Sequence, residues 1–110
     1  MLTRNEVISV LEKNKEELQN QFGVEKLVLF GSFARNQQTE ESDIDVFVTM
    51  PAKLFLVIAV KQYIEDIIGL KVDVVRNHKR LNELLLKEIQ KDGIDIFECK
   101  GIGNRVTQSN

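Results

Sequence analysis

The chain has 110 residues, of which 43% are hydrophobic and 29% are charged. These proportions are those of an ordinary globular protein, and the length allows one domain with a modest core. A net charge of −2 argues against a protein whose main task is to hold extended nucleic acid on a basic surface. No apolar run reaches the roughly 18 residues that a membrane-spanning helix needs.

The single cysteine, Cys99, excludes an internal disulfide, and we interpret it as a structural thiol. The first residues do not have the pattern of a signal peptide. Both features favour a reducing compartment, so we expect a cytoplasmic protein without a membrane partner. We expect the domain to span residues 1–100, and we expect the polar segment 101–110 to be a disordered tail.

The N-terminal segment predicts a helix. Thr3 and Glu6 have the spacing of a capping box, and the helix is expected to end at Gly23. Its apolar stripe consists of Val7, Leu11, Leu18 and Phe22. A strand is expected at residues 25–30, and its apolar run at 27–30 is that of a central position in a sheet.

A polar loop at 36–42 leads into a predicted strand at 43–48. Further elements are expected as a helix at 52–68, a strand at 71–76, a helix at 80–91 and a strand at 94–98. This order predicts an α/β (α+β) fold, a small mixed sheet of about four strands with the helices packed on one face. The other face would then carry the acidic residues described next.

Two carboxylates lie two residues apart in the predicted strand at 43–48. Asp43 and Asp45 therefore project to the same face, while Ile44, Val46 and Val48 point to the core. Two like charges about 6 Å apart repel by roughly 3 kcal/mol at an effective dielectric near 20. A cation between them would relieve this repulsion, and hard oxygen ligands favour Mg²⁺.

Gly31 and Ser32 stand where the apolar strand stops. A short helical turn can begin there, and its free backbone N–H groups can hold phosphate. A plain strand-to-helix turn capped by serine is the alternative interpretation. Together with the aspartates, the pair suggests a site for Mg²⁺ and a nucleoside triphosphate.

One motif resembles that of the nucleotidyltransferases of the DNA polymerase β superfamily. It consists of Gly31-Ser32, followed after ten residues by Asp43-Ile44-Asp45. It is most similar to the minimal nucleotidyltransferase (MNT) antitoxins encoded beside HEPN-domain toxins. Asp73, in Lys71-Val72-Asp73-Val74-Val75, matches the later strand that carries the third carboxylate of the family. The resemblance covers about residues 3–98.

The resemblance implies roles for these residues. Asp43 and Asp45 would bridge two Mg²⁺ ions and the triphosphate of ATP, and Asp73 would hold the catalytic metal and assist deprotonation of the acceptor. Gly31 and Ser32 would bind phosphate. Arg35 would neutralise phosphate, contact a protein acceptor or remain solvated, and Ser42 would contribute to nucleotide binding or only cap the loop. Many relatives carry a basic residue at the position of Phe33 and glycine at that of Asn36, where asparagine tolerates a left-handed backbone.

Three functions remain open from the sequence. The first is transfer of AMP from ATP to a hydroxyl of a partner protein, which the resemblance implies is a HEPN toxin modified on tyrosine. The second is adenylylation of a small molecule such as an aminoglycoside. The third is a non-catalytic antitoxin that acts by contact, for which the very apolar segment 54–68 offers a partner surface or a homodimer surface.

Overall fold

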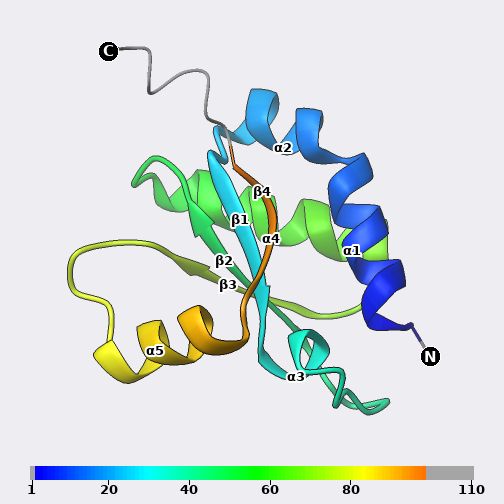
Figure 1. Ribbon diagram of the computed structural model, residues 1–110. Helices are drawn as coiled ribbons and strands as arrows, with labels where there is room; N and C mark the ends of the chain where they lie inside the picture. Colours follow the sequence, from blue (N-terminus) through cyan, green and yellow to red (C-terminus); the bar gives the residue numbers. More distant parts are fainter. Residues whose placement is uncertain (1, 99–110) are drawn as a thin grey trace.

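A mixed sheet of four strands forms the centre of the protein, as predicted. The computed structural model describes residues 2–98 (Figure 1). The strands lie in the order β3-β2-β1-β4, with β2 and β3 parallel and β1 antiparallel to both of its neighbours. Their bounds are β1 Lys26–Phe30, β2 Ile44–Thr49, β3 Val72–Arg76 and β4 Ile94–Glu98. Cys99 and the predicted tail at 101–110 lie outside the described residues.

The N-terminal segment forms two helices, α1 (Arg4–Lys13) and α2 (Lys15–Phe22), so the prediction of a single helix was wrong. The capping box at Thr3 and Glu6 is confirmed. The break falls at Asn14, whose side-chain Nδ2 donates to the carbonyl of Val10 at 2.8 Å. Its Oδ1 accepts a hydrogen bond from the Tyr63 hydroxyl at 2.8 Å. Asparagine competes in this way for backbone hydrogen bonds and favours helix ends.

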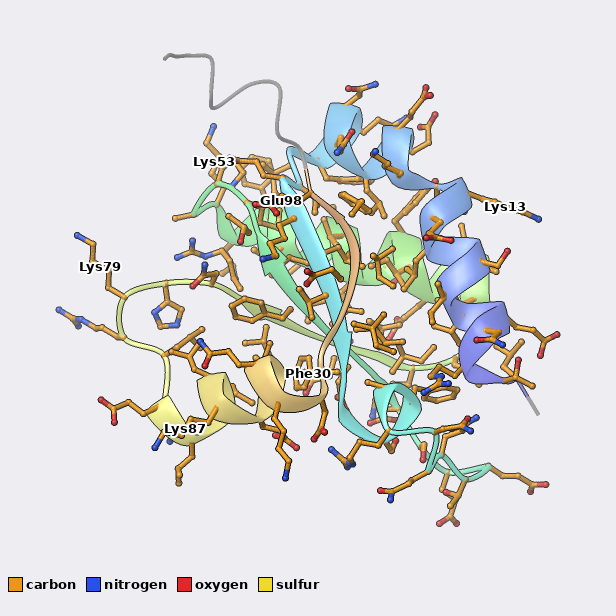
Figure 2. The ribbon with its side chains drawn as sticks, viewed as in Figure 1. Lys13, Phe30, Lys53, Lys79, Lys87 and Glu98 are labelled. Atoms are coloured by element: carbon orange, nitrogen blue, oxygen red, sulfur yellow. The ribbon has the colours of Figure 1, made fainter. Side chains whose placement is uncertain are left out.

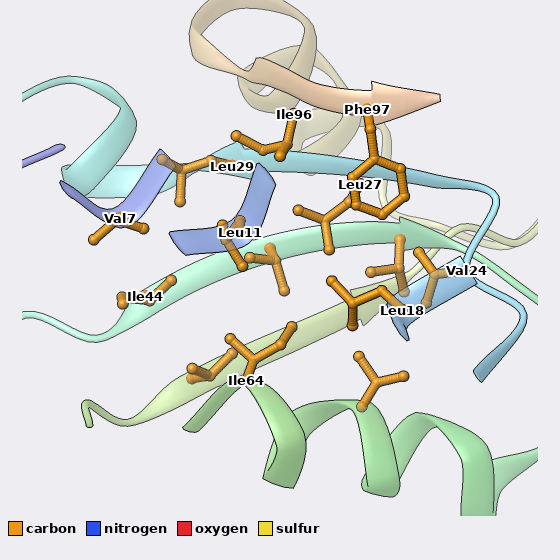
Figure 3. Close-up of a cluster of buried hydrophobic side chains, with 14 of the residues drawn as sticks. Val7, Leu11, Leu18, Val24, Leu27, Leu29, Ile44, Ile64, Ile96 and Phe97 are labelled. Carbon is orange, nitrogen blue, oxygen red and sulfur yellow. The ribbon is translucent and has the colours of Figure 1, made fainter. Parts of the chain in front are cut away.

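One face of the sheet is covered by α1, α2 and α4 (Leu54–Ile68), as Figure 1 shows. Alternate residues of the strands point into this layer because successive side chains of a strand face opposite sides. Figure 3 shows the core that results, in which strand and helix residues interlock. Its fully buried members include Val7, Leu11, Leu18, Leu27, Leu29, Ile44, Val46, Val48, Val60 and Ile64.

The opposite face is covered in part by α5 (Glu83–Asp92), so the prediction that all helices pack on one face was wrong for this helix (Figure 1). Ile89 of α5 packs with Val28, Phe30 and Phe47 in a second apolar cluster, and Phe30 is labelled in Figure 2. The physical reason is that Val28 and Phe30 of β1 and Phe47 of β2 are apolar and point to this face. Such residues need cover from water, and α5 supplies it.

Within residues 2–98, no helix is both long enough and apolar enough to cross a bilayer. The helix α3 (Gly31–Ala34) is a single turn that follows β1 directly. After it, the chain passes through an exposed loop to β2. These two connections place the candidate site at one end of the sheet.

Candidate functional site

The three aspartates predicted as metal ligands are brought to one end of the sheet, on the face that carries α5. The parallel pairing of β2 and β3 places Asp45 directly opposite Asp73. Asp43 immediately precedes β2 and is exposed. Because Ile44 is fully buried on the other face, the strand alternation turns Asp43 and Asp45 away from the main core, as predicted.

Gly31 lies against the carboxylate of Asp45. The antiparallel pairing of β1 and β2 sets Phe30 opposite Asp45, so the chain turns into α3 beside this side chain. Gly31 has a φ of +76°, in the left-handed region, and a Cβ atom added there would stand 2.1 Å from Asp45 Oδ2. Glycine is therefore required at this position for both its backbone angle and its lack of a side chain. Ser32 follows as the second residue of α3 and is half-buried.

Arg35 ends α3 and is tied to α5. Its Nη1 lies 3.1 Å from Glu88 Oε1 and 3.9 Å from Asp92 Oδ2. Its Nε donates to the side-chain oxygen of Gln37 at 3.2 Å. The arginine is thus near the carboxylates but is held by acidic residues of another helix. The roles of Glu88 and Asp92 were not predicted from the sequence. They lie more than 50 positions after Arg35, and no local sequence pattern extends over that distance.

Ser42 organises the loop before β2. Its hydroxyl accepts a hydrogen bond from the backbone N–H of Thr39 at 2.8 Å, and its own N–H donates to the Thr39 carbonyl at 3.1 Å. This geometry is that of the loop cap that the sequence left open as one of two interpretations. A role for Ser42 in nucleotide binding stays a prediction.

Two further positions fit the sequence reasoning. Asn36 adopts a φ of +59°, so asparagine holds a left-handed backbone at this position, as was expected from the sequence. Phe33 is buried in the main core with 1% of its surface exposed. Phe33 therefore stabilises the fold beneath the Gly31–Ser32 turn, and its side chain is not exposed beside the aspartates.

The acidic residues perturb one another. Burial raises the pKa of Asp45 to about 6, and the charges of Asp73, Asp43 and Glu88 add to this increase while Arg35 opposes it. At neutral pH Asp45 is therefore mostly anionic, and its charge lowers the stability of the free protein. A bound cation would reverse this effect, and such perturbed groups are common at functional sites.

This perturbation predicts a stability effect of Asp45→Asn. The pKa of Asp45 rises from an ordinary value of 3.8 to about 6, so the native state holds its proton more tightly and loses stability as pH rises between these values. The full shift would be worth about 3 kcal/mol, which solvent screening of the half-exposed side chain reduces to about 1 kcal/mol. We expect Asp45→Asn to be about 1 kcal/mol more stable at pH 7.5 without Mg²⁺ and equal to wild type below pH 4, by urea denaturation.

A matched control is Asp95→Asn, which removes an exposed carboxylate from β4 of the same sheet. If Asp45→Asn were less stable than wild type at pH 7.5, the assignment of an unfavourable charge to Asp45 would be wrong.

The donor set fits Mg²⁺ bound together with phosphate. Within residues 2–98, no group of three or more His, Cys, Asp or Glu side chains is placed so that it could hold a metal ion by itself. Mg²⁺ does not require such a group, because it is commonly held by one or two carboxylates and by oxygens of a substrate phosphate. Asp43, Asp45 and Asp73 supply hard oxygen donors beside Gly31, and, after burial, the charges of Asp73, Asp43 and Glu88 contribute to the raised pKa of Asp45.

Two other acidic residues near β3 are engaged elsewhere. Glu65 accepts a hydrogen bond from the backbone N–H of Val72 at 3.0 Å and pairs with Lys61 at 3.5 Å. Asp66 accepts from the side-chain amide of Gln62 at 2.9 Å. Both lie on α4, on the opposite face of the sheet from Asp45, whereas Asp73 lies directly opposite Asp45 on the neighbouring strand.

Comparison with known families shows which family the chain belongs to. The sequence profile described as "Polymerase beta, Nucleotidyltransferase" matches residues 12–101, which include Gly31, Ser32 and the three aspartates. The chain belongs to this family. It is a nucleotidyltransferase with the mixed sheet of the minimal members of that fold.

Relatives of this nucleotidyltransferase carry more specific names. A "Putative protein adenylyltransferase" of Methanocaldococcus jannaschii is 37% identical over 98 residues, which cover 87% of this chain and 100% of the relative. "Protein adenylyltransferase MntA" of Thermococcus cleftensis is 39% identical over 77 residues, which cover 68% of this chain and 78% of the relative.

Solved structures share the fold of the nucleotidyltransferase. A complex described as a "tri-AMPylated Shewanella oneidensis HEPN toxin in complex with MNT antitoxin" matches with a TM-score of 0.61 and 16% identity, over 89% of this chain and 78% of that chain. A toxin–antitoxin structure with AMP-PNP matches with a TM-score of 0.62 and 21% identity, over 90% of this chain and 76% of that chain.

Proposed function

We propose that this nucleotidyltransferase transfers AMP from ATP to a hydroxyl of a partner protein, with two Mg²⁺ ions, and that the partner is a HEPN-type toxin. The observation that carries the proposal is the placement of Asp43, Asp45 and Asp73 beside the Gly31 turn. The names of the relatives as protein adenylyltransferases support the reaction, and the MNT–HEPN complex supports the class of partner.

The reaction assigns one task to each group. Gly31 and Ser32 would hold phosphate oxygens, and Asp43 and Asp45 would hold the metal ions, which neutralise phosphate charge when bound. An acceptor hydroxyl oxygen forms a bond to the α-phosphorus, and the bond from that phosphorus to the oxygen bridging to the β-phosphate breaks. Pyrophosphate leaves with that oxygen, and Asp73 accepts the hydroxyl proton.

Titration of ATP with Mg²⁺ by calorimetry tests the nucleotide site. We expect wild type to bind only when Mg²⁺ is present, because triphosphate and carboxylates repel each other without a cation. The double variant Asp43→Ala/Asp45→Ala should lose the signal, whereas Asp95→Asn should retain it. A folded wild-type protein that does not bind Mg²⁺-ATP would contradict the proposed nucleotide site.

A contact-only antitoxin is the second candidate because α4 presents an apolar surface. Leu54, Phe55 and Ile58 are 75%, 68% and 57% exposed on its first two turns. Large exposed apolar side chains that gather on one element are typical of interaction sites. The two candidates differ in one measurement, which is neutralisation of the toxin in cells by Asp43→Ala/Asp45→Ala. Full neutralisation by this variant would favour contact over catalysis.

A further inference from the structure

The ion pairs of Arg35 connect the turn that begins at Gly31 to α5, on the face of the sheet that carries the aspartates. Arg35 belongs to the turn that begins at Gly31, and its partners Glu88 and Asp92 belong to α5. Residues four apart on a helix lie on the same side, so both carboxylates face the guanidinium together. The helix is fixed from below, because Ile89 is buried against Val28 and Phe30. The anchor for Arg35 is therefore a rigid element.

The contacts leave part of the guanidinium unused. Nη1 faces Glu88 and Asp92, and Nε donates to Gln37. An arginine has five N–H donors in a planar fork, so Nη2 is still able to bind a phosphate oxygen while Nη1 stays paired. Arg35 can thus hold both partners at once, which lysine with a single ammonium would do less well.

Charge explains why such an anchor is useful at this place. Arg35 is close enough to Asp45 for its charge to act on that carboxylate, and Asp43 and Asp73 are close to Asp45 as well. A flexible arginine beside three carboxylates would be drawn onto them and would then compete with a metal ion for the same oxygens. Glu88 and Asp92 of α5 give Arg35 competing partners other than the three aspartates.

We propose that Glu88 and Asp92 are positioning residues that hold Arg35 at the edge of the aspartate cluster with Nη2 directed to the triphosphate of the substrate. This inference rests on the proposed function, since it assigns two residues of α5 to the support of nucleotide binding at that site. Glu88 acts through Arg35 and does not itself touch the nucleotide.

The test measures binding of α,β-methylene-ATP, whose α–β linkage resists transfer, in the presence of Mg²⁺ by calorimetry. The variants are Glu88→Gln, Arg35→Ala and the double variant, with Glu12→Gln on the exposed side of α1 as the matched control. We expect Glu88→Gln to weaken binding by about fivefold, the scale of one partly exposed ion pair. Arg35→Ala should weaken it at least as much, and the double variant should be no weaker than Arg35→Ala alone, because Glu88 acts only through Arg35.

Two results would overturn the inference. Glu88→Gln could bind as tightly as wild type or more tightly, which would mean that Glu88 only repels the triphosphate. Its effect could instead add to that of Arg35→Ala, which would mean that Glu88 supports α5 and not Arg35. If wild type itself failed to bind while Glu12→Gln and wild type were both folded, the proposed nucleotide site would fail, and this inference with it.

Discussion

Asp45→Asn should lower the rate of AMP transfer to the partner by a factor on the order of 10³ or more. Asp45 is the most buried of the three aspartates, lies opposite Asp73 and borders the Gly31 turn. Asp45 is therefore the carboxylate at the centre of the proposed site, with Asp73 and Gly31 as its neighbours. Asparagine keeps the shape and the packing but removes the negative charge that would hold a cation. The measurement is the initial rate of labelled AMP incorporation with Mg²⁺-ATP.

The control for Asp45→Asn is again Asp95→Asn, which makes the same chemical change on β4 of the same sheet and should leave the rate within about twofold of wild type. Asp45→Asn itself is expected to be folded and somewhat more stable than wild type at neutral pH, so a loss of its transfer rate cannot be attributed to unfolding. Transfer by Asp45→Asn within tenfold of wild type would show that the carboxylate cluster is not the catalytic centre.

Gly31→Ala should destabilise the protein by about 2–4 kcal/mol and abolish nucleotide binding. Two effects add at this position. A left-handed backbone costs alanine about 1 kcal/mol, and the new Cβ atom would overlap Asp45 Oδ2 at 2.1 Å. To relieve the overlap, the Asp45 carboxylate or the turn must move, and either shift disturbs the site. Urea denaturation gives the first quantity and calorimetry with Mg²⁺-ATP the second.

Gly69→Ala separates these two effects. Gly69 has a φ of +85°, but a Cβ atom there would have no neighbour within 4 Å. This variant should therefore show the backbone cost of about 1 kcal/mol alone, with unchanged nucleotide binding. Equal destabilisation by Gly31→Ala and Gly69→Ala would mean that the contact between Gly31 and Asp45 is not constrained as the structure indicates.

Local rules account for the parts of the fold that were predicted from the sequence. Strand alternation placed Asp43 and Asp45 on the face opposite Ile44, and the helix that ends at Gly69 was recognised from its spacing. The break at Asn14 was missed because Val7, Leu11 and Leu18 remain at helical spacing across it. Periodicity reports which residues face the core, and it is insensitive to a single residue that leaves the helical backbone conformation.

The position of α5 shows where a sequence signal was present but was not used. Leu27, Val28, Leu29 and Phe30 are apolar without alternation, which indicates a strand covered on both faces. Val28 and Phe30 point to the face of the aspartates and are covered by Ile89. By contrast, no sequence pattern could pair Arg35 with Glu88, because their contact arises only from the packing of α5 on the sheet.

The most direct test of the proposed function is label transfer from ATP to a HEPN-type partner protein. The purified chain, the partner and Mg²⁺ are incubated with ATP labelled at either the α- or the γ-phosphate, and Asp45→Asn is run beside wild type. We expect the partner to acquire label from the α-phosphate only, with a mass increase of whole AMP groups, and we expect Asp45→Asn to transfer almost none. Label from the γ-phosphate, or no label on a partner that the chain binds and neutralises, would contradict it.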